Sequence, residues 1–187
     1  MQWTWIVLGI VAVLILALIA TYNGLVARRQ RVRDAWANVD TELRRRLDLI
    51  PNVVETVKGY ASHEREVLER VTQARSAAAG AATPAAAAAA EGPLTAALRQ
   101  LFAVAEAYPD LKANQNFLAL QTELSATEDR IASMRSRYNG AVRDLNEAVQ
   151  RFPAVLIARS LGFSEETYYE VEAAVRDAGA PKVDFSG

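Results

Sequence analysis

The feature that most constrains this chain is the apolar segment at residues 3–22, which reads WTWIVLGIVAVLILALIATY. Residues 5–20 contain eleven Ile, Leu or Val residues, and no charged side chain occurs before Arg28. Roughly 20 residues of α-helix rise about 30 Å, which is the thickness of a bilayer's hydrocarbon core. Insertion of such a segment gains on the order of 3–7 kcal/mol, with no charge to oppose it. The segment therefore predicts a transmembrane helix and a membrane anchor over residues 1–23.

Two other interpretations of the apolar segment are weaker. A buried core helix normally shows a polar stripe, and this segment has none. A cleaved signal peptide needs a basic region before the apolar run and a small-x-small cleavage site, whereas Ala17-Leu18-Ile19-Ala20 has the wrong spacing. Trp3 and Trp5 at one end and Tyr22 at the other are typical of side chains at a membrane–water interface.

The charges that flank the apolar segment predict its orientation. Positive charge follows it at once, whereas only the α-amino group precedes it; the four basic residues are Arg28, Arg29, Arg31 and Arg33. Because basic flanks stay in the cytoplasm, we expect the N-terminus outside and residues 24–187 in the cytoplasm. We also expect these four arginines to contact anionic lipid headgroups, at about 1 kcal/mol each.

Beyond the anchor, apolar residues recur mostly at steps of three or four, and two gaps of seven each skip one position; this is the spacing of a helix seam in a coiled coil or bundle. The first such series is Leu25, Val32, Trp36, Val39, Leu43, Leu47, Ile50, Val54, Val57, Ala61, Leu68 and Val71. Pro51 lies inside it, and because the series continues in phase we expect a kinked helix there rather than a new element. Three acid–base pairs at i,i+4 support the helix: Asp40–Arg44, Glu42–Arg46 and Glu66–Arg70.

Residues 76–92 are rich in Ala and interrupt this pattern. We interpret them as a connector without a core of its own, with some helix over residues 85–91. Gly92-Pro93 then resembles an N-cap followed by proline at the first helical position, which predicts a short helix over residues 93–107.

The second long series begins after Tyr108-Pro109-Asp110 and predicts one helix over residues 109–151. Its apolar positions are Phe117, Leu120, Leu124, Ile131, Met134, Tyr138, Val142, Leu145, Val149 and Phe152. After Pro153 comes an apolar patch over residues 154–163, and Ser164 is expected to cap a final helix that ends near Gly179 and Pro181. The helical domain is thus residues 24–178, followed by a tail over residues 179–187. No strand alternation occurs, so the predicted fold class is all-α.

The sequence offers no set of residues for catalysis or metal binding. There is no Cys, and His63 is the single histidine; Val67 stands where an HExxH motif needs its second one. We interpret His63 as a helix-surface residue. Phosphate-binding loops and nucleophile elbows are also missing, and the net charge of −1 gives no support for nucleic-acid binding. We therefore expect neither an enzyme nor a bound cofactor.

The triple Arg44-Arg45-Arg46 is the densest charge cluster. One interpretation is a solvated helix face paired with Asp40 and Glu42. The other is a docking patch for an acidic partner or for lipid headgroups.

Long stretches of the chain resemble the bacterial LemA family. These are residues 22–26 (YNGLV), 36–64 (WANVDTELRRRLDLIPNVVETVKGYASHE) and 108–139 (YPDLKANQNFLALQTELSATEDRIASMRSRYN), with an FP…LGF…Y pattern at 152–168. The resemblance implies an N-terminal anchor and an elongated antiparallel bundle of four helices, two of them long and of coiled-coil type. It also implies that the anchored membrane is a bacterial inner membrane, and it assigns no molecular function.

Two functions fit these expectations. The first is a membrane-anchored scaffold or interaction protein that forms homo-oligomers, especially if the closed bundle leaves an apolar face. The second is an adaptor or regulator of a membrane enzyme such as a protease or a signalling kinase. Membrane lipids and an unknown membrane or cytoplasmic protein are the expected partners.

Overall fold

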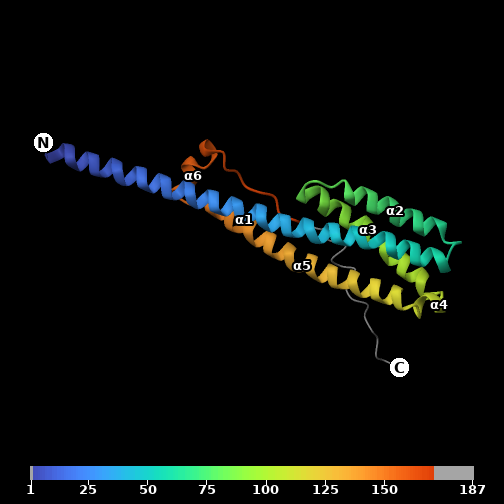
Figure 1. The fold of residues 1–187 in the computed structure, drawn as a ribbon. Coiled ribbons are helices and arrows are strands. Elements are labelled where there is room, and N and C mark those ends of the chain that lie inside the picture. Colours follow the sequence, from blue (N-terminus) through green and yellow to red (C-terminus); the bar gives the residue numbers. More distant parts are fainter. Residues whose placement is uncertain (1, 171–187) are drawn as a thin grey trace, which may run out of the picture. The chain divides into compact units, whose positions relative to one another are not determined.

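The computed structural model describes residues 2–170, and within that range every regular element is helical (Figure 1). The all-α prediction is therefore confirmed. The elements are α1 (Gln2–Tyr60), α2 (Arg65–Ala79), α3 (Pro84–Glu106), α4 (Pro109–Lys112), α5 (Gln115–Gln150), α6 (Ala154–Ile157) and the 3₁₀ turn η1 (Arg159–Leu161).

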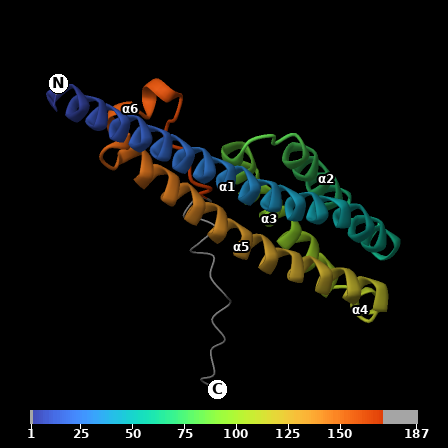
Figure 2. The same ribbon diagram turned by 60° about the vertical axis from the view of Figure 1, so that its left-hand side comes forward.

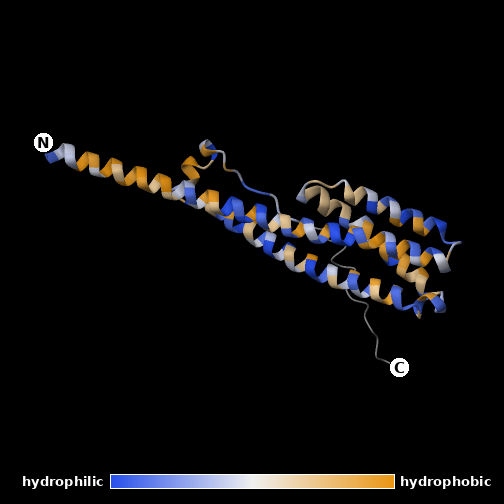
Figure 3. Ribbon diagram, in the orientation of Figure 1, coloured by the Kyte–Doolittle hydropathy of each residue, from blue (hydrophilic) through white to orange (hydrophobic). Residues whose placement is uncertain are grey.

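Helix α1 is continuous over 59 residues, through Pro51. Its first part is long and apolar enough to cross a membrane, and none of its most apolar stretch is buried in the chain. Figure 3 shows this change along α1, from the apolar orange turns that follow its first residues to alternating polar and apolar turns. The prediction that no new element begins at Pro51 is confirmed.

The chain divides into two compact units. Unit 1 comprises residues 1–39 and 134–168, and unit 2 comprises residues 40–133 and 169–187. Helices α1 and α5 contribute to both units and lie side by side (Figures 1 and 2).

Unit 1 is a pair of antiparallel helix segments from α1 and α5. Trp36 of α1 packs edge-on against Tyr138 of α5, with ring centroids 5.8 Å apart. The predicted seam residues fill this core; those buried are Leu25, Val32, Val39, Tyr138, Val142, Leu145 and Val149. Phe152 is an exception, because 75% of it is exposed and α5 has already ended at Gln150.

Unit 2 adds α2, α3 and α4 to the next part of α1 and the first part of α5. Its core again uses the predicted seam, with Ile50, Val57, Val71, Phe117 and Leu124 all buried. The direction of the two long helices is also antiparallel here, since Glu42 pairs with Arg130 and Tyr60 with Asn114. Leu94, Leu98 and Leu101 of α3 complete the core, as their spacing predicts.

The helix predicted over residues 85–91 is confirmed, but it is part of a longer helix, and most of the other Ala-rich residues are helical too. Helix α2 continues to Ala79, and α3 begins at Pro84 and runs through Pro93. Thr83 is the N-cap of α3, and its hydroxyl accepts a hydrogen bond from the Ala86 N–H at 3.2 Å. The helix α3 therefore begins earlier than Gly92-Pro93 predicts. Thr83 caps it, Pro84 occupies the first helical position, and the alanines that follow have the highest helix propensity of any residue.

The predicted single helix over residues 109–151 is divided. Helix α4 ends at Lys112, and Asn114 starts α5 by accepting the Phe117 N–H through its Oδ1 at 3.1 Å. Asn114 also donates from Nδ2 to the Tyr60 hydroxyl, at 3.0 Å. Capping at Asn114 therefore ends one helix and starts the next, whereas Gly140 does not interrupt α5.

The helix predicted from Ser164 does not form over residues 164–170. The backbone of Glu166 hydrogen bonds with the side chain of Asn146 instead, through an N–H···Oδ1 bond of 2.8 Å and an Nδ2–H···O=C bond of 3.0 Å. Tyr138 donates its hydroxyl to the Thr167 carbonyl at 2.9 Å. Because these N–H and C=O groups of Glu166 and Thr167 hydrogen bond with side chains of α5, they cannot form the backbone hydrogen bonds of a helix. The rest of that predicted helix, and the 179–187 tail, lie outside the described residues.

Candidate functional site

The most strongly built polar site in unit 2 is a buried arginine on α1. Arg46 is only 2% exposed and lies between carboxylates from two other helices. Its Nη1 donates to Glu91 of α3 and to Glu128 of α5, each at 3.0 Å, and its Nη2 donates again to Glu91. Three segments distant in the sequence are thereby joined at one guanidinium.

The electrostatics of this site are those of a fixed ion pair. Burial by itself lowers the pKa of Arg46, but the hydrogen bond and charge of Glu91, with those of Glu128, raise that pKa above its ordinary value. Arg46 is therefore always charged, and Glu91, itself 6% exposed, is its buried counter-ion. Breaking such a pair leaves an uncompensated charge in the interior and typically costs 3–5 kcal/mol.

A second, more exposed network surrounds the first. Arg130 of α5 donates to Glu42 at 2.9 Å and to Glu123 at 3.2 Å, and Arg45 donates to Glu123 at 2.7 Å. The hydrogen bond to Glu42 is the main reason why the pKa of Arg130 is raised. This network links α1 to α5 within unit 2, but its exposure to water makes it weaker than the Arg46 site.

The structure separates the three arginines of the predicted docking patch. Arg46 is buried, so the docking interpretation is wrong for this residue. Arg44 and Arg45 have side chains that are 75% and 53% exposed. Of the predicted i,i+4 pairs, Asp40–Arg44 and Glu66–Arg70 form. Glu42–Arg46 is wrong, because Glu42 pairs with Arg130 and Arg46 with Glu91 and Glu128.

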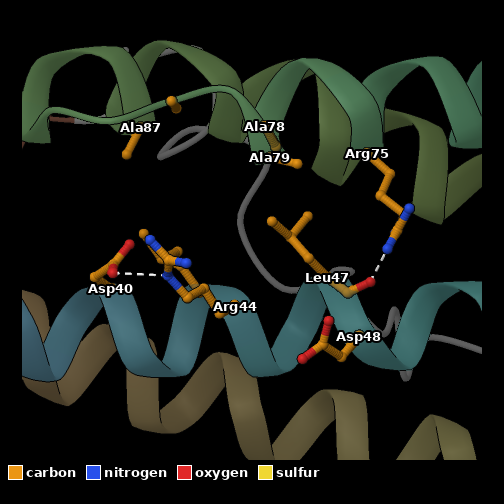
Figure 4. Close-up of a pocket in the computed structure, with 10 residues that line it drawn as sticks. Asp40, Arg44, Leu47, Asp48, Arg75, Ala78, Ala79 and Ala87 are labelled. Atoms are coloured by element: carbon orange, nitrogen blue, oxygen red, sulfur yellow. Dashed lines mark hydrogen bonds and ion pairs between the residues drawn. The ribbon is translucent and has the colours of Figure 1, made fainter.

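A hollow of about 270 Å³ opens beside Arg44 between α1 and the α2–α3 turn (Figure 4). Arg75 reaches across it and donates from Nε to the backbone carbonyl of Leu47 at 2.8 Å. That carbonyl would normally accept the N–H of residue 51, which is a proline and has none. Arg75 therefore satisfies the acceptor that Pro51 leaves open in the middle of α1.

The two walls of this hollow differ in character. Asp40, Arg44 and Asp48 line one side, and small alanines line the other. Across residues 2–170, no group of three or more His, Asp or Glu side chains is placed to hold a metal. His63 is exposed, but it lies in the turn between α1 and α2. The prediction that it belongs to a helix surface is therefore wrong.

The four arginines after the apolar segment all belong to unit 1. Arg31 and Arg33 are exposed, whereas Arg28 and Arg29 are half-buried. Arg28 donates to the Gly24 carbonyl at 3.1 Å, and the guanidinium carbon of Arg29 lies 4.5 Å from the centre of the Phe163 ring.

Sequence reasoning missed five residues that build unit 2's polar sites: Glu91, Glu123, Glu128, Arg130 and Arg75. One signal was present, because Glu91 is the single charged residue in the Ala-rich stretch 76–92. A lone carboxylate among alanines is a candidate partner for a distant cation. The other four lie on charged helix faces and carry no comparable signal.

Comparison with known proteins places the chain in a family. The sequence model of the LemA family matches residues 35–185. The chain is 26% identical to magnetosome protein MamQ from Magnetospirillum gryphiswaldense, over 90% of this chain and 71% of that protein. MamQ 1 from Paramagnetospirillum magneticum matches equally well. Protein LemA from Metamycoplasma hominis is 27% identical, over 74% of this chain and 64% of that protein. Since the family model matches well over half of the chain, this chain belongs to the LemA family.

Proposed function

We propose that this protein is a membrane-anchored helical scaffold or interaction protein that acts by binding and self-association rather than by catalysis. The observation that carries the proposal is the exposure of the apolar segment. Its side chains are all exposed from residue 2 to residue 20, although the same helix buries a regular seam from Leu25 onward. Apolar side chains without a partner in the chain are stabilised by a bilayer.

The proposed orientation places residues 24–187 in the cytoplasm of a bacterium, with the inner membrane as the anchoring bilayer. Support comes from the four arginines at residues 28–33, because cytoplasmic flanks are enriched in basic residues. Arg31 and Arg33 are exposed and suit contact with anionic headgroups, in addition to Arg28 and Arg29.

A binding role fits the way the charges of unit 2 are used. Glu42, Glu91 and Glu128 each form an ion pair with an arginine of another helix, which joins α1, α3 and α5. Arg44 and Arg45 remain exposed on α1 and are the proposed contact for an acidic partner or for lipid headgroups.

The anchor also favours self-association, because copies confined to one membrane plane meet at raised effective concentration. In unit 2 the exposed large apolar side chains among the described residues are Tyr60 and Leu118. The closed bundle therefore leaves little apolar surface there. We propose that copies associate through the membrane-embedded part of α1 and through polar contacts.

A pull-down from native membranes, with the mass of the intact complex measured, tests this proposal. We expect several copies of the chain in one complex. Recovery of one membrane enzyme in stoichiometric amount would favour the adaptor function instead, and a lone monomer contradicts both. Arg45→Glu should change the recovered partners, whereas the matched control Arg137→Glu, on the exposed face of α5 in unit 1, should not.

A further inference from the structure

The segment after α5 exposes three large apolar side chains within five residues. Phe152 is 75% exposed, Val155 is 50% exposed and Leu156 is 70% exposed. Over the described residues outside the apolar segment and its flanking Tyr22, the other large apolar side chains with comparable exposure are scattered singly: Tyr60, Leu118 and Tyr168. A contiguous exposed cluster of this kind marks a contact surface.

The short helix α6 is folded so that these side chains face outward. Ala154 and Ala158 are buried, and Phe163 returns to the core of unit 1 after Gly162, which turns the chain with a φ of +75°. The segment is thus packed on one side, and its bulky apolar residues are on the other. A failure of local folding does not explain the exposure.

The cluster lies in unit 1, close to the apolar segment of α1. A hollow of about 160 Å³ is lined by Ala20, Leu25 and Arg28 of α1 and by Phe152 and Ala154. Nearby, Tyr22 packs edge-on against Phe163 with ring centroids 5.8 Å apart. The cluster therefore lies beside the end of the apolar segment, as the orange turns of α6 next to α1 in Figure 3 also show.

Basic side chains surround the cluster. Arg151 precedes it, Arg159 follows it, and both are exposed. Arg28 and Arg29 reach the same region from α1. A surface with apolar side chains at its centre and arginines around them is typical of protein segments that enter the headgroup region of an anionic bilayer.

We propose that residues 152–163 form a second membrane contact, which does not cross the bilayer. Phe152, Val155 and Leu156 insert into the outer part of the leaflet from which α1 emerges, about 5–10 Å deep. The proposal rests on the proposed function, in which the apolar segment spans that bilayer. The contact would add a second attachment point for unit 1, at the membrane exit of α1.

Site-specific fluorescence in vesicles tests this contact directly, because the chain has no cysteine of its own. Full-length Leu156→Cys and Val155→Cys are each labelled with an environment-sensitive NBD probe. They are reconstituted in vesicles of phosphatidylcholine and phosphatidylglycerol, with and without spin-labelled lipids that quench at shallow or deep positions. A probe at Leu14→Cys reports how deep the apolar segment lies in the bilayer. Ser136→Cys is the matched control, fourteen residues before the end of α5 and thus about 21 Å from it.

We expect probes at residues 155 and 156 to lose emission to the shallow quencher, while the probe at residue 136 does not. The probe at residue 14 should lose emission most strongly to the deep quencher. If residues 155 and 156 behave like residue 136 while residue 14 is quenched, the second contact is wrong and the anchor stands. A blue shift at residue 156 without lipid quenching indicates a second protein copy and also overturns the contact. Absence of quenching at residue 14 overturns the anchor itself.

Discussion

At the scale of single residues, Arg46 is the side chain on which unit 2 depends most. Arg46→Ala removes the counter-charge of the buried Glu91 and leaves that carboxylate in the interior. We expect a loss of about 3–5 kcal/mol in the free energy of unfolding. The control Arg44→Ala removes an exposed i,i+4 pair and should cost below about 1 kcal/mol. Denaturant unfolding in detergent micelles measures both; equal costs would show that burial of Arg46 has no energetic effect.

Arg75 and Pro51 form a coupled pair through the carbonyl of Leu47. Arg75→Ala leaves that acceptor unsatisfied and should cost about 1–3 kcal/mol. In a Pro51→Ala background the helix supplies its own N–H, so the cost of Arg75→Ala should fall. A double-mutant cycle of unfolding free energies measures the coupling. Independent, additive effects would contradict the role given to Arg75.

We expect ionisation of the Tyr138 hydroxyl to lower the stability of the folded chain at alkaline pH. Burial, and next the charge of Glu166, raise the pKa of its hydroxyl above the usual value of about 10. The folded state therefore holds this proton more tightly than the unfolded state does. Its stabilising effect is complete below pH about 10 and is lost as pH rises from there through the folded-state pKa.

The variant Tyr138→Phe isolates this effect. At neutral pH the variant should be less stable by about 1 kcal/mol, because the bond to the Thr167 carbonyl is lost. As pH rises above about 10, the difference should shrink, since only the wild-type chain loses stability through Tyr138. Unfolding curves at pH 8 to 11 measure it, and a difference independent of pH would contradict the assignment.

Local charge pairs could be predicted from the sequence, but distant ones could not. Asp40–Arg44 forms because four residues on a helix bring side chains together. The same rule fails for Arg46, whose partners Glu91 and Glu128 come from other helices. The packing of α3 and α5 against α1 brings these two carboxylates to Arg46, and spacing along one helix does not show that packing.

At the scale of elements, the Ala-rich start of α3 is a packed helix rather than a spacer. Ala87 and Ala88 are buried, so larger side chains there meet neighbouring helices. We expect Ala88→Leu to destabilise the chain by about 1–3 kcal/mol through overpacking. The neighbouring Ala89 is exposed, and Ala89→Leu should be close to neutral. Thermal unfolding of both variants is the measurement; a neutral Ala88→Leu would restore the connector interpretation.

The long helices were predictable and the places where they break were less so. Large apolar residues at three–four spacing contrast with the polar residues around them, so the seam from Leu25 to Val71 is visible. A run of alanines shows no contrast between apolar and polar positions, so the burial of residues 87 and 88 cannot be predicted from the sequence. Over residues 164–170 the chain is not helical, and this depends on Asn146, whose side chain bonds with the Glu166 backbone from twenty residues away.

At the scale of the whole molecule, one continuous helix combines the apolar segment with the seam of both units. Residues 2–20 of α1 are all exposed in the described chain, whereas most seam residues from Leu25 onward are buried against other helices. A bilayer for the first part and neighbouring helices for the second account for both patterns with one physical cause, the removal of apolar surface from water.

Accessibility on the two sides of the membrane tests this account most directly. Gln2→Cys and Ser136→Cys place single thiols before and after the apolar segment. They are treated in cells with a maleimide that cannot cross the inner membrane. The account predicts that position 2 reacts in intact cells, that position 136 reacts only after permeabilisation, and that alkaline carbonate leaves the chain in the membrane. Equal accessibility of both positions in intact cells, or release of the chain by carbonate, would contradict a single membrane crossing.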